Sequence, residues 1–188
     1  MEKAKAGYEY LLAYKITVPI YDYTVDFCKL HFPNLPNHTD RTKDQMTQAA
    51  RSTMSNIVEG NKHASRKGYI YLVGIARGSL EELLKDYQAF ARHNKLEIYP
   101  PAKAKTDIRE IGEIWETIRA TPTLPDHPKF PNLPDSPEKQ VNLMITLVSQ
   151  AGYFVDRLEK SLKEKHMKEG GLTEELYRKR IEYKKNIK

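Results

Sequence analysis

Two short stretches decide the fold, Arg51–Gly60 (RSTMSNIVEG) and Ser79–Tyr87 (SLEELLKDY). In the second, apolar residues recur every three or four positions, which is the spacing of one face of an α-helix. The first also has helical spacing, but it carries one arginine, three hydroxyl side chains and an asparagine among few apolar residues. We interpret it as a helix whose small, hydroxyl-rich flank packs closely on its neighbours as part of an assembly surface. The alternative is that these polar side chains only face water.

Helical spacing continues along almost the whole chain, and no segment shows the alternation that is typical of a strand. We predict a first helix within 8–31, interrupted by Pro19 so that its main body is 20–31. Segment 32–40 (FPNLPNHTD) excludes helix, and Thr39 or Asp40 is suited to cap a second helix that ends at Gly60. The residues expected on the buried face of this second helix are Met46, Ala50, Thr53 and Ile57.

Three further helices are predicted. Ser65 caps the first of them, and Pro100–Pro101 separates it from a short helix. The third begins near Pro137 and stops at Gly170–Gly171, after which Thr173 is predicted to cap a short helical tail. The expected buried residues of the three helices are Leu72, Ile75, Ala76, Ser79, Leu80, Leu83, Tyr87 and Phe90; then Ile108, Ile111, Trp115 and Ile118; then Val141, Met144, Val148, Ala151, Val155, Leu158 and Leu162.

Prolines occupy every third position from 122 to 137. Polyproline II has three residues per turn, so these prolines would lie on one edge of an extended rod. We interpret the rod as a semi-rigid spacer along the bundle; the alternative is a docking site for a partner. The predicted fold is all-α: an up-down four-helix bundle over 1–168, a Pro-rich extended segment over 121–137 before the last long helix, and a short basic C-terminal helix within 169–188.

Several classes of protein are excluded or disfavoured by the sequence. A single cysteine, Cys28, precludes an intramolecular disulfide and disfavours a thiolate zinc site. The N-terminal residues lack the pattern of a signal peptide, and no apolar run is long enough to span a membrane, so we expect a cytoplasmic protein without membrane contact. No Glu-x-x-His pair, nucleotide-binding loop or hydrolase motif is present. We therefore predict no catalytic residues, no metal, no cofactor and no enzymatic activity.

The chain has a formal net charge of +6, and its basic residues form two dense regions. At about 100° per residue around the helix axis, the basic residues of the third helix, and of the residues just before it, fall within a sector of about 140°. Gly74 and Gly78 share this sector and would let another backbone come close, so they are the predicted oligomer interface. The sector contains Lys62, Arg66, Lys67, Arg77, Lys85 and Arg92, and the tail adds Arg178, Lys179 and Arg180. Binding of nucleic acid needs many phosphate contacts, which a ring of subunits would multiply; the alternative is a solvated face.

Segment 48–90 resembles the bacterial four-helix bundle proteins encoded in intervening sequences of 23S ribosomal RNA genes. That family also includes the accessory variability proteins of diversity-generating retroelements. The matching motifs are Asn-Ile-x-Glu-Gly, which ends at Gly60, and Gly-Ser-Leu-x-Glu-Leu over 78–83. Segments 49–52, 83–87, 142–157 and 169–180 look like the longer, suffix-domain subfamily.

The resemblance implies an up-down bundle that closes into a homopentamer, with basic surface for RNA, DNA or a reverse transcriptase. Many shorter members carry an Arg-Arg pair where this chain has Thr47 and Gln48, and Arg51, one turn further on, is a partial substitute. The leading hypothesis is a non-catalytic oligomer that binds nucleic acid or acts as an adaptor, serving a mobile element. The alternative is a protein-protein interaction scaffold without nucleic-acid binding, and an enzyme comes third.

Overall fold

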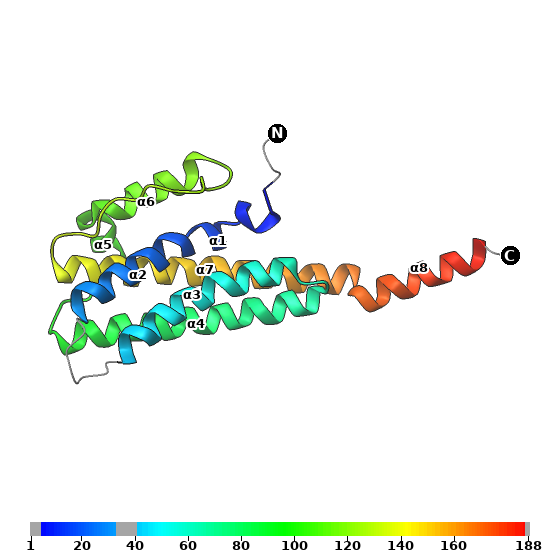
Figure 1. Cartoon of the computed structure of the whole chain (residues 1–188), viewed down its shortest axis with the longest axis horizontal. Coiled ribbons are helices and arrows are strands. Elements are labelled where there is room, and N and C mark those ends of the chain that lie inside the picture. Colours follow the sequence, from blue (N-terminus) through cyan, green and yellow to red (C-terminus); the bar gives the residue numbers. More distant parts are fainter. Residues whose placement is uncertain (1–4, 33–40, 187–188) are drawn as a thin grey trace.

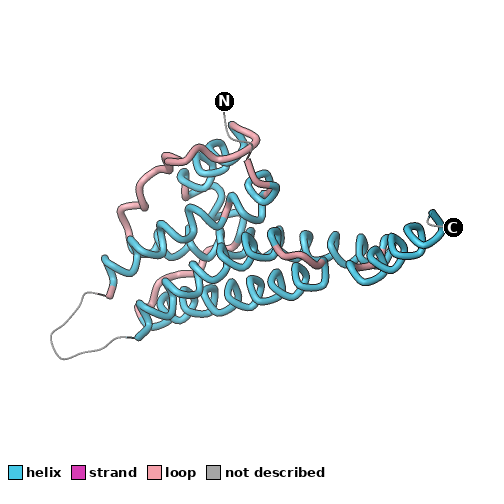
Figure 2. The backbone as a smooth tube through the Cα atoms, turned by 45° about the vertical axis from the view of Figure 1, so that its right-hand side comes forward, coloured by secondary structure: helices cyan, strands magenta, loops and turns pink. Residues whose placement is uncertain are grey.

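The computed structural model describes residues 5–32 and 41–186, and every regular element in these ranges is a helix, as predicted. The predicted cap at Thr39 or Asp40 lies outside the described residues. Helices α2, α3, α4 and α7 lie side by side, and α8 projects from the end of α7 away from them (Figure 1, Figure 2). The elements are η1 (Gly7–Tyr10), α1 (Leu12–Lys15), α2 (Thr17–His31), α3 (Arg41–Lys62), α4 (Arg66–His93), α5 (Pro101–Asp107), α6 (Arg109–Ala120), α7 (Pro137–Glu169) and α8 (Leu172–Asn186).

Helix α4 is the centre of the packing, because both α3 and α7 run along it. Most of its predicted stripe is buried, but Ile75 is 37% exposed and Val73 takes a buried position instead. The apolar stripe in the sequence therefore identifies the buried face of α4 correctly, but it assigns one edge of that face to the wrong residue. On α7 the predicted residues from Val141 to Val155 are buried, and the last two are only partly so. The predicted faces of α3 and α6 are confirmed, except that Trp115 is half-buried.

Three polar residues of RSTMSNIVEG form hydrogen bonds within the chain. The Thr53 hydroxyl is buried and donates to the Ala49 carbonyl (3.0 Å). The Ser79 hydroxyl of α4 donates to the Ser52 hydroxyl of α3 (3.0 Å), and Asn56 Nδ2 donates to the Ser52 carbonyl (2.8 Å). Ser52, Thr53 and Asn56 therefore do not merely face water, and the assembly surface stays a prediction. Their small side chains allow α3 and α4 of one chain to approach closely while every hydroxyl keeps a partner.

Gly60 does not end α3, which continues to Lys62, and the predicted boundary is wrong. The glycine is buried inside the helix, and a Cβ at this position would lie 2.4 Å from Tyr69 Cδ2. The ring of Tyr69, in the first turn of α4, occupies the space that any other residue would need. The glycine is thus explained by the close approach of α4.

Two other predicted boundaries differ from the structure. Helix α2 begins at Thr17, so Pro19 lies in its first turn, where a backbone N–H has no partner inside the helix and proline is tolerated. Helix α7 ends at Gly170, with φ at +77°, as predicted. The tail helix begins at Leu172, so Thr173 is not its cap; instead the Gly171 N–H donates to the Glu174 carboxylate (2.9 Å).

The Pro-rich segment between α6 and α7 packs against its own chain. Bends at 121–123, 126–127 and 135–136 interrupt it, so the straight rod is wrong. The Tyr23 hydroxyl of α2 donates to the Pro131 carbonyl (2.6 Å). At the other end, buried Lys15 donates from Nζ to the carbonyls of Ile118 (2.6 Å) and Thr121 (3.1 Å), and its burial lowers the pKa of this amine. The segment returns beside α6 to the start of α7 (Figure 1).

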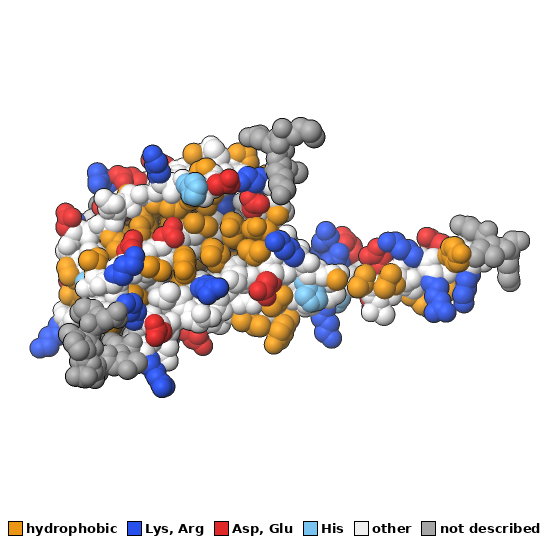
Figure 3. Space-filling view, in the orientation of Figure 1, with side chains coloured by type: hydrophobic (Ala, Val, Ile, Leu, Met, Phe, Trp, Pro, Cys, Tyr) orange, Lys and Arg blue, Asp and Glu red, His pale blue; other side chains and the backbone are white. Residues whose placement is uncertain are grey.

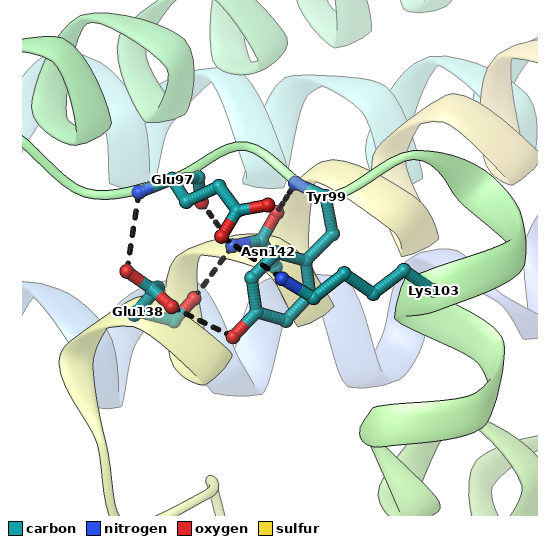
Figure 4. Close-up of polar contacts among 5 residues, drawn as sticks. All are labelled: Glu97, Tyr99, Lys103, Glu138 and Asn142. Carbon is teal, nitrogen blue, oxygen red and sulfur yellow. Dashed lines mark hydrogen bonds and ion pairs between the residues drawn. The ribbon is translucent and has the colours of Figure 1, made fainter.

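A polar cluster fixes the linker between α4 and α5 onto α7 (Figure 4). Asn142 is buried; its amide donates to the Glu97 carbonyl (2.7 Å), and its oxygen accepts the Tyr99 N–H (2.7 Å). The Tyr99 hydroxyl donates to Glu138 (2.7 Å), which raises the pKa of Tyr99 to about 12 and lowers that of Glu138. Lys103 pairs with Glu97 (2.9 Å) and lies 4.0 Å from the Tyr99 ring centroid. These mutual contacts account for the shifted pKa values, so the cluster is structural.

We expect Gly60→Ala to lower the free energy of unfolding by about 1–3 kcal/mol, because the new methyl overlaps the Tyr69 ring. Gly112→Ala on α6 is the matched control. Nothing lies within 4 Å of a Cβ there, so it should stabilise the protein by up to about 1 kcal/mol. Urea unfolding followed by circular dichroism measures both. Equal effects of the two substitutions would contradict the packing of Tyr69 on Gly60.

Candidate nucleic-acid interface

Two of the predicted cations, Arg77 and Lys85, form ion pairs within the chain, and that of Arg77 joins α4 to α7. Arg77 Nε contacts Asp156 (2.7 Å) on α7, and its Nη1 contacts Glu81 (3.2 Å). Lys85 pairs with the same glutamate (3.4 Å), and the hydrogen bonds from Arg77 and Lys85 lower the pKa of Glu81. The charge of Arg77 and Lys85 is thus largely neutralised within the chain.

Arg66 holds the end of α7. Its Nη1 donates to the carbonyls of Gly170 (2.7 Å) and Lys165 (3.2 Å), and its Nη2 contacts the Glu169 carboxylate (2.8 Å). Arg178 of α8 donates to the Glu169 carbonyl (2.8 Å). The last carbonyls of a helix have no partners inside the helix and carry partial negative charge, so two guanidinium groups stabilise this end. They also fix the direction in which α8 leaves the body.

A hollow of about 780 Å³ opens where α4 begins and α7 meets α8. It brings together three predicted residues from distant parts of the sequence, Arg66, Arg178 and Lys179. Lys165 and Lys168 also line it, and the sequence reading had not selected them. The sequence shows both lysines just after the apolar pattern of α7, near the end of that helix. Only the fold shows that they lie beside α4.

Three lysines at this end are available to a ligand. Lys67, Lys165 and Lys168 are exposed, and none of them enters any ion pair found among the described residues. Lys179 pairs with Glu175 (2.6 Å). Figure 3 shows Lys and Arg side chains around the junction and along α8, with acidic and apolar side chains between them. We define the α7–α8 basic end as Arg66, Lys67, Lys165, Lys168, Arg178 and Lys179.

The remaining predicted residues are not part of this cluster. Lys62 lies 5.7 Å from the Tyr8 ring centroid, and Arg51, Arg92 and Arg180 are exposed at other places. The role of each in binding nucleic acid stays a prediction.

The two glycines predicted to form an oligomer interface are exposed on α4. Nothing lies within 4 Å of a Cβ at Gly74 or Gly78, so the packing of a single chain does not require glycine at either position. Tyr71 (69% exposed) and Ile75 flank them. Their role as an interface stays a prediction.

Carboxylates of α4 form a second cluster of charged side chains, beside another hollow. Glu82 and Asp86 line a hollow of about 710 Å³ between α3 and α4, together with Asp44 and Arg41. Burial raises the pKa of Asp86, and the charge of Glu82 adds to this effect.

Within the described ranges, no group of three His, Cys, Asp or Glu side chains is placed to hold a metal ion. Among the helices described, none has both the length and the hydropathy to cross a membrane.

The model of the 23S rRNA-intervening sequence protein family matches residues 12–117, more than half of the 188 residues. This chain belongs to that family. The resemblance seen in the sequence is confirmed. No curated protein and no solved structure matches the chain significantly. The match covers α1 to α5 and most of α6, whereas α7, which packs along α4, and the α7–α8 junction lie beyond it.

We expect Arg66→Gln to lower the free energy of unfolding by about 1–2 kcal/mol, because it removes charge-assisted bonds to the end of α7. Hydrogen exchange should accelerate in the last turn of α7 and in α8. Its neighbour provides the control: Lys67→Gln should leave both quantities unchanged. If exchange near Gly170 is unaffected in Arg66→Gln, the guanidinium does not hold the junction.

Proposed function

We propose that this protein is a non-catalytic, homo-oligomeric nucleic-acid-binding protein and that its ligand is RNA. The observation that carries the proposal is the α7–α8 basic end, where the exposed Lys165 and Lys168 line a hollow together with Arg66 and Arg178, and the exposed Lys67 lies at the start of α4. Lysines without carboxylate partners contribute most to phosphate binding, because nothing has to be displaced. The family name, 23S rRNA-intervening sequence protein, favours RNA.

The proposal includes assembly. Helices α2, α3, α4 and α7 form an up-down four-helix bundle, and copies associate through the α4 face that contains Tyr71, Gly74, Ile75 and Gly78. Each glycine inside a helix costs about 0.5–1 kcal/mol relative to alanine. Contacts within one chain do not offset this cost, and a neighbouring copy at close approach would. A pentamer is the closed ring that the resemblance implies.

A ring explains how a modest basic end can bind RNA. One chain supplies few phosphate contacts, whereas a symmetric ring repeats the same lysines around an axis, and affinity then depends steeply on salt. Helix α8 would extend the surface, since it projects from the body with its side chains exposed. Binding of this kind recognises backbone and shape and does not read bases. The bound ring could act as an adaptor for a mobile element or its reverse transcriptase.

The alternative is a protein-protein interaction scaffold without nucleic-acid binding. Exposed apolar side chains on α8, among them Leu176 (55%) and Tyr177 (66%), favour it. An isolated helix of this length is marginal in water. A protein partner that covers α8 would stabilise it without any phosphate contact.

We expect the triple variant Lys67→Glu, Lys165→Glu, Lys168→Glu to abolish retardation of RNA in low-salt gels. Arg66 and Arg77 are left intact, because reversing them would place like charges against Glu169 and Asp156. The control is Lys95→Glu, Lys129→Glu, Lys139→Glu, which makes the same change in net charge at exposed lysines elsewhere. Wild-type protein that fails to retard RNA at low salt would favour the scaffold, and equal loss in both variants would show a non-specific charge effect.

We expect wild-type protein at micromolar concentration to have the mass of a homo-oligomer, a pentamer, by light scattering after size exclusion. Gly78→Arg on α4 should give a folded monomer, because a Cβ at this exposed position has nothing within 4 Å inside the chain, and the long side chain blocks close approach of a copy. Gly112→Arg is a matched change on α6 and should keep the oligomer. A wild-type monomer contradicts the assembly, and an intact Gly78→Arg oligomer contradicts the chosen face.

A further inference from the structure

A second surface on this molecule combines aromatic rings with cations. A groove of about 850 Å³ runs between α6 and α7, and Trp115, Tyr153 and Phe154 form its apolar lining. Lys105, Arg109 and Arg119 line it as well, against one acidic residue, Glu116. No residue of this groove was among the nucleic-acid-binding residues selected from the sequence, because the rings and cations belong to helices separated by the Pro-rich segment.

The aromatic rings are held by contacts with one another and with Gln150, and Trp115 and Tyr153 are partly exposed. Trp115 is half-buried; its Nε1 donates to Gln150 Oε1 (2.7 Å), and its ring centroid lies 5.5 Å from that of Phe154. Tyr153 is 57% exposed, and its ring meets Phe154 edge-on at 5.5 Å. Contacts among the three rings and Gln150 therefore hold the floor of the groove, and the exposed part of the Tyr153 ring, beside the Arg157 guanidinium, is accessible to a planar ligand.

The cations lie where a negatively charged group on that ligand would be. The Arg119 guanidinium carbon is 5.0 Å from the Trp115 ring centroid, and the Arg157 carbon is 5.8 Å from that of Tyr153. Arg109 forms ion pairs with Glu113 (3.2 Å) and Glu110 (3.9 Å), but its side chain is 79% exposed. A planar aromatic group attached to an anion matches this arrangement, and an unpaired nucleotide has both parts.

We propose that the α6–α7 groove binds an unpaired nucleotide, with the base stacked on Tyr153 and its phosphates held by Lys105, Arg109 and Arg119. This inference rests on the proposed function and adds the class of RNA: single-stranded, or paired with an unpaired segment. Gln150 in the groove and Lys165 at the basic end are fifteen residues apart on α7, a rise of about 22 Å. One RNA molecule can thus contact both surfaces.

Trp115 reports on the groove directly, because the chain contains one tryptophan. We expect an unstructured 12-nucleotide RNA to quench its fluorescence saturably, and a blunt RNA duplex of equal length to leave it unchanged. Tyr153→Ala should weaken binding of the single strand about 5- to 150-fold, and Arg119→Gln should weaken it in the same direction. Both residues are exposed, and circular dichroism checks that the variants fold. The control is Tyr10→Ala, another exposed tyrosine, which should change nothing.

The outcomes separate this inference from the proposed function. Retardation of RNA in gels without quenching of Trp115 would overturn the groove and leave RNA binding at the basic end intact. Absence of both would overturn the proposed function as well. A Trp115 spectrum that depends on protein concentration without RNA would mean that a second copy occupies the groove, which also overturns the proposal.

Discussion

The close approach of α3 and α4 is the constraint on which the rest of the structure depends. Gly60 leaves room for the Tyr69 ring, and Ser52 and Ser79 bond across the contact with small side chains. Helix α4 packs along α7 as well as along α3. The long α7 is thereby held along α4 up to the point where α8 leaves the body.

Ion pairs within the chain determine which cations are available to bind a ligand. Arg66 and Arg77 are buried more than ordinary surface cations and are directed at Glu169 and Asp156, so they contribute to the joint between α4 and α7. Lys67, Lys165 and Lys168, at the same end of the molecule as Arg66, have no such partners within the described chain. A basic sector seen in a sequence thus divides into cations that hold the fold and cations that remain available, and only the positions of the carboxylates on α7 separate the two groups.

The sequence predicted the helices well and their limits less well. Apolar residues in steps of three and four locate α3, α4, α6 and α7, because helix periodicity depends on neighbours along the chain. Ser65 accepts the Gly68 N–H at the start of α4 as predicted, since a cap is also a local contact. Gly60 and Pro19 were misread, because the same residue types stop a helix or sit within one according to what packs there. Of the candidate site, the sequence supplied Arg66, Lys67, Arg178 and Lys179, and it missed Lys165, Lys168 and the α6–α7 groove.

By itself, therefore, the sequence determined the all-α class, the buried faces of the long helices, the family and the excess of positive charge. These properties depend on composition, short-range periodicity and motifs within one segment. The tertiary structure alone decided that α4 joins α7 through ion pairs, that the Pro-rich segment folds back on α2, and that rings of α6 and α7 share one groove. Each of these depends on residues tens of positions apart, whose distance in space is set by helix packing and is not encoded in any local pattern.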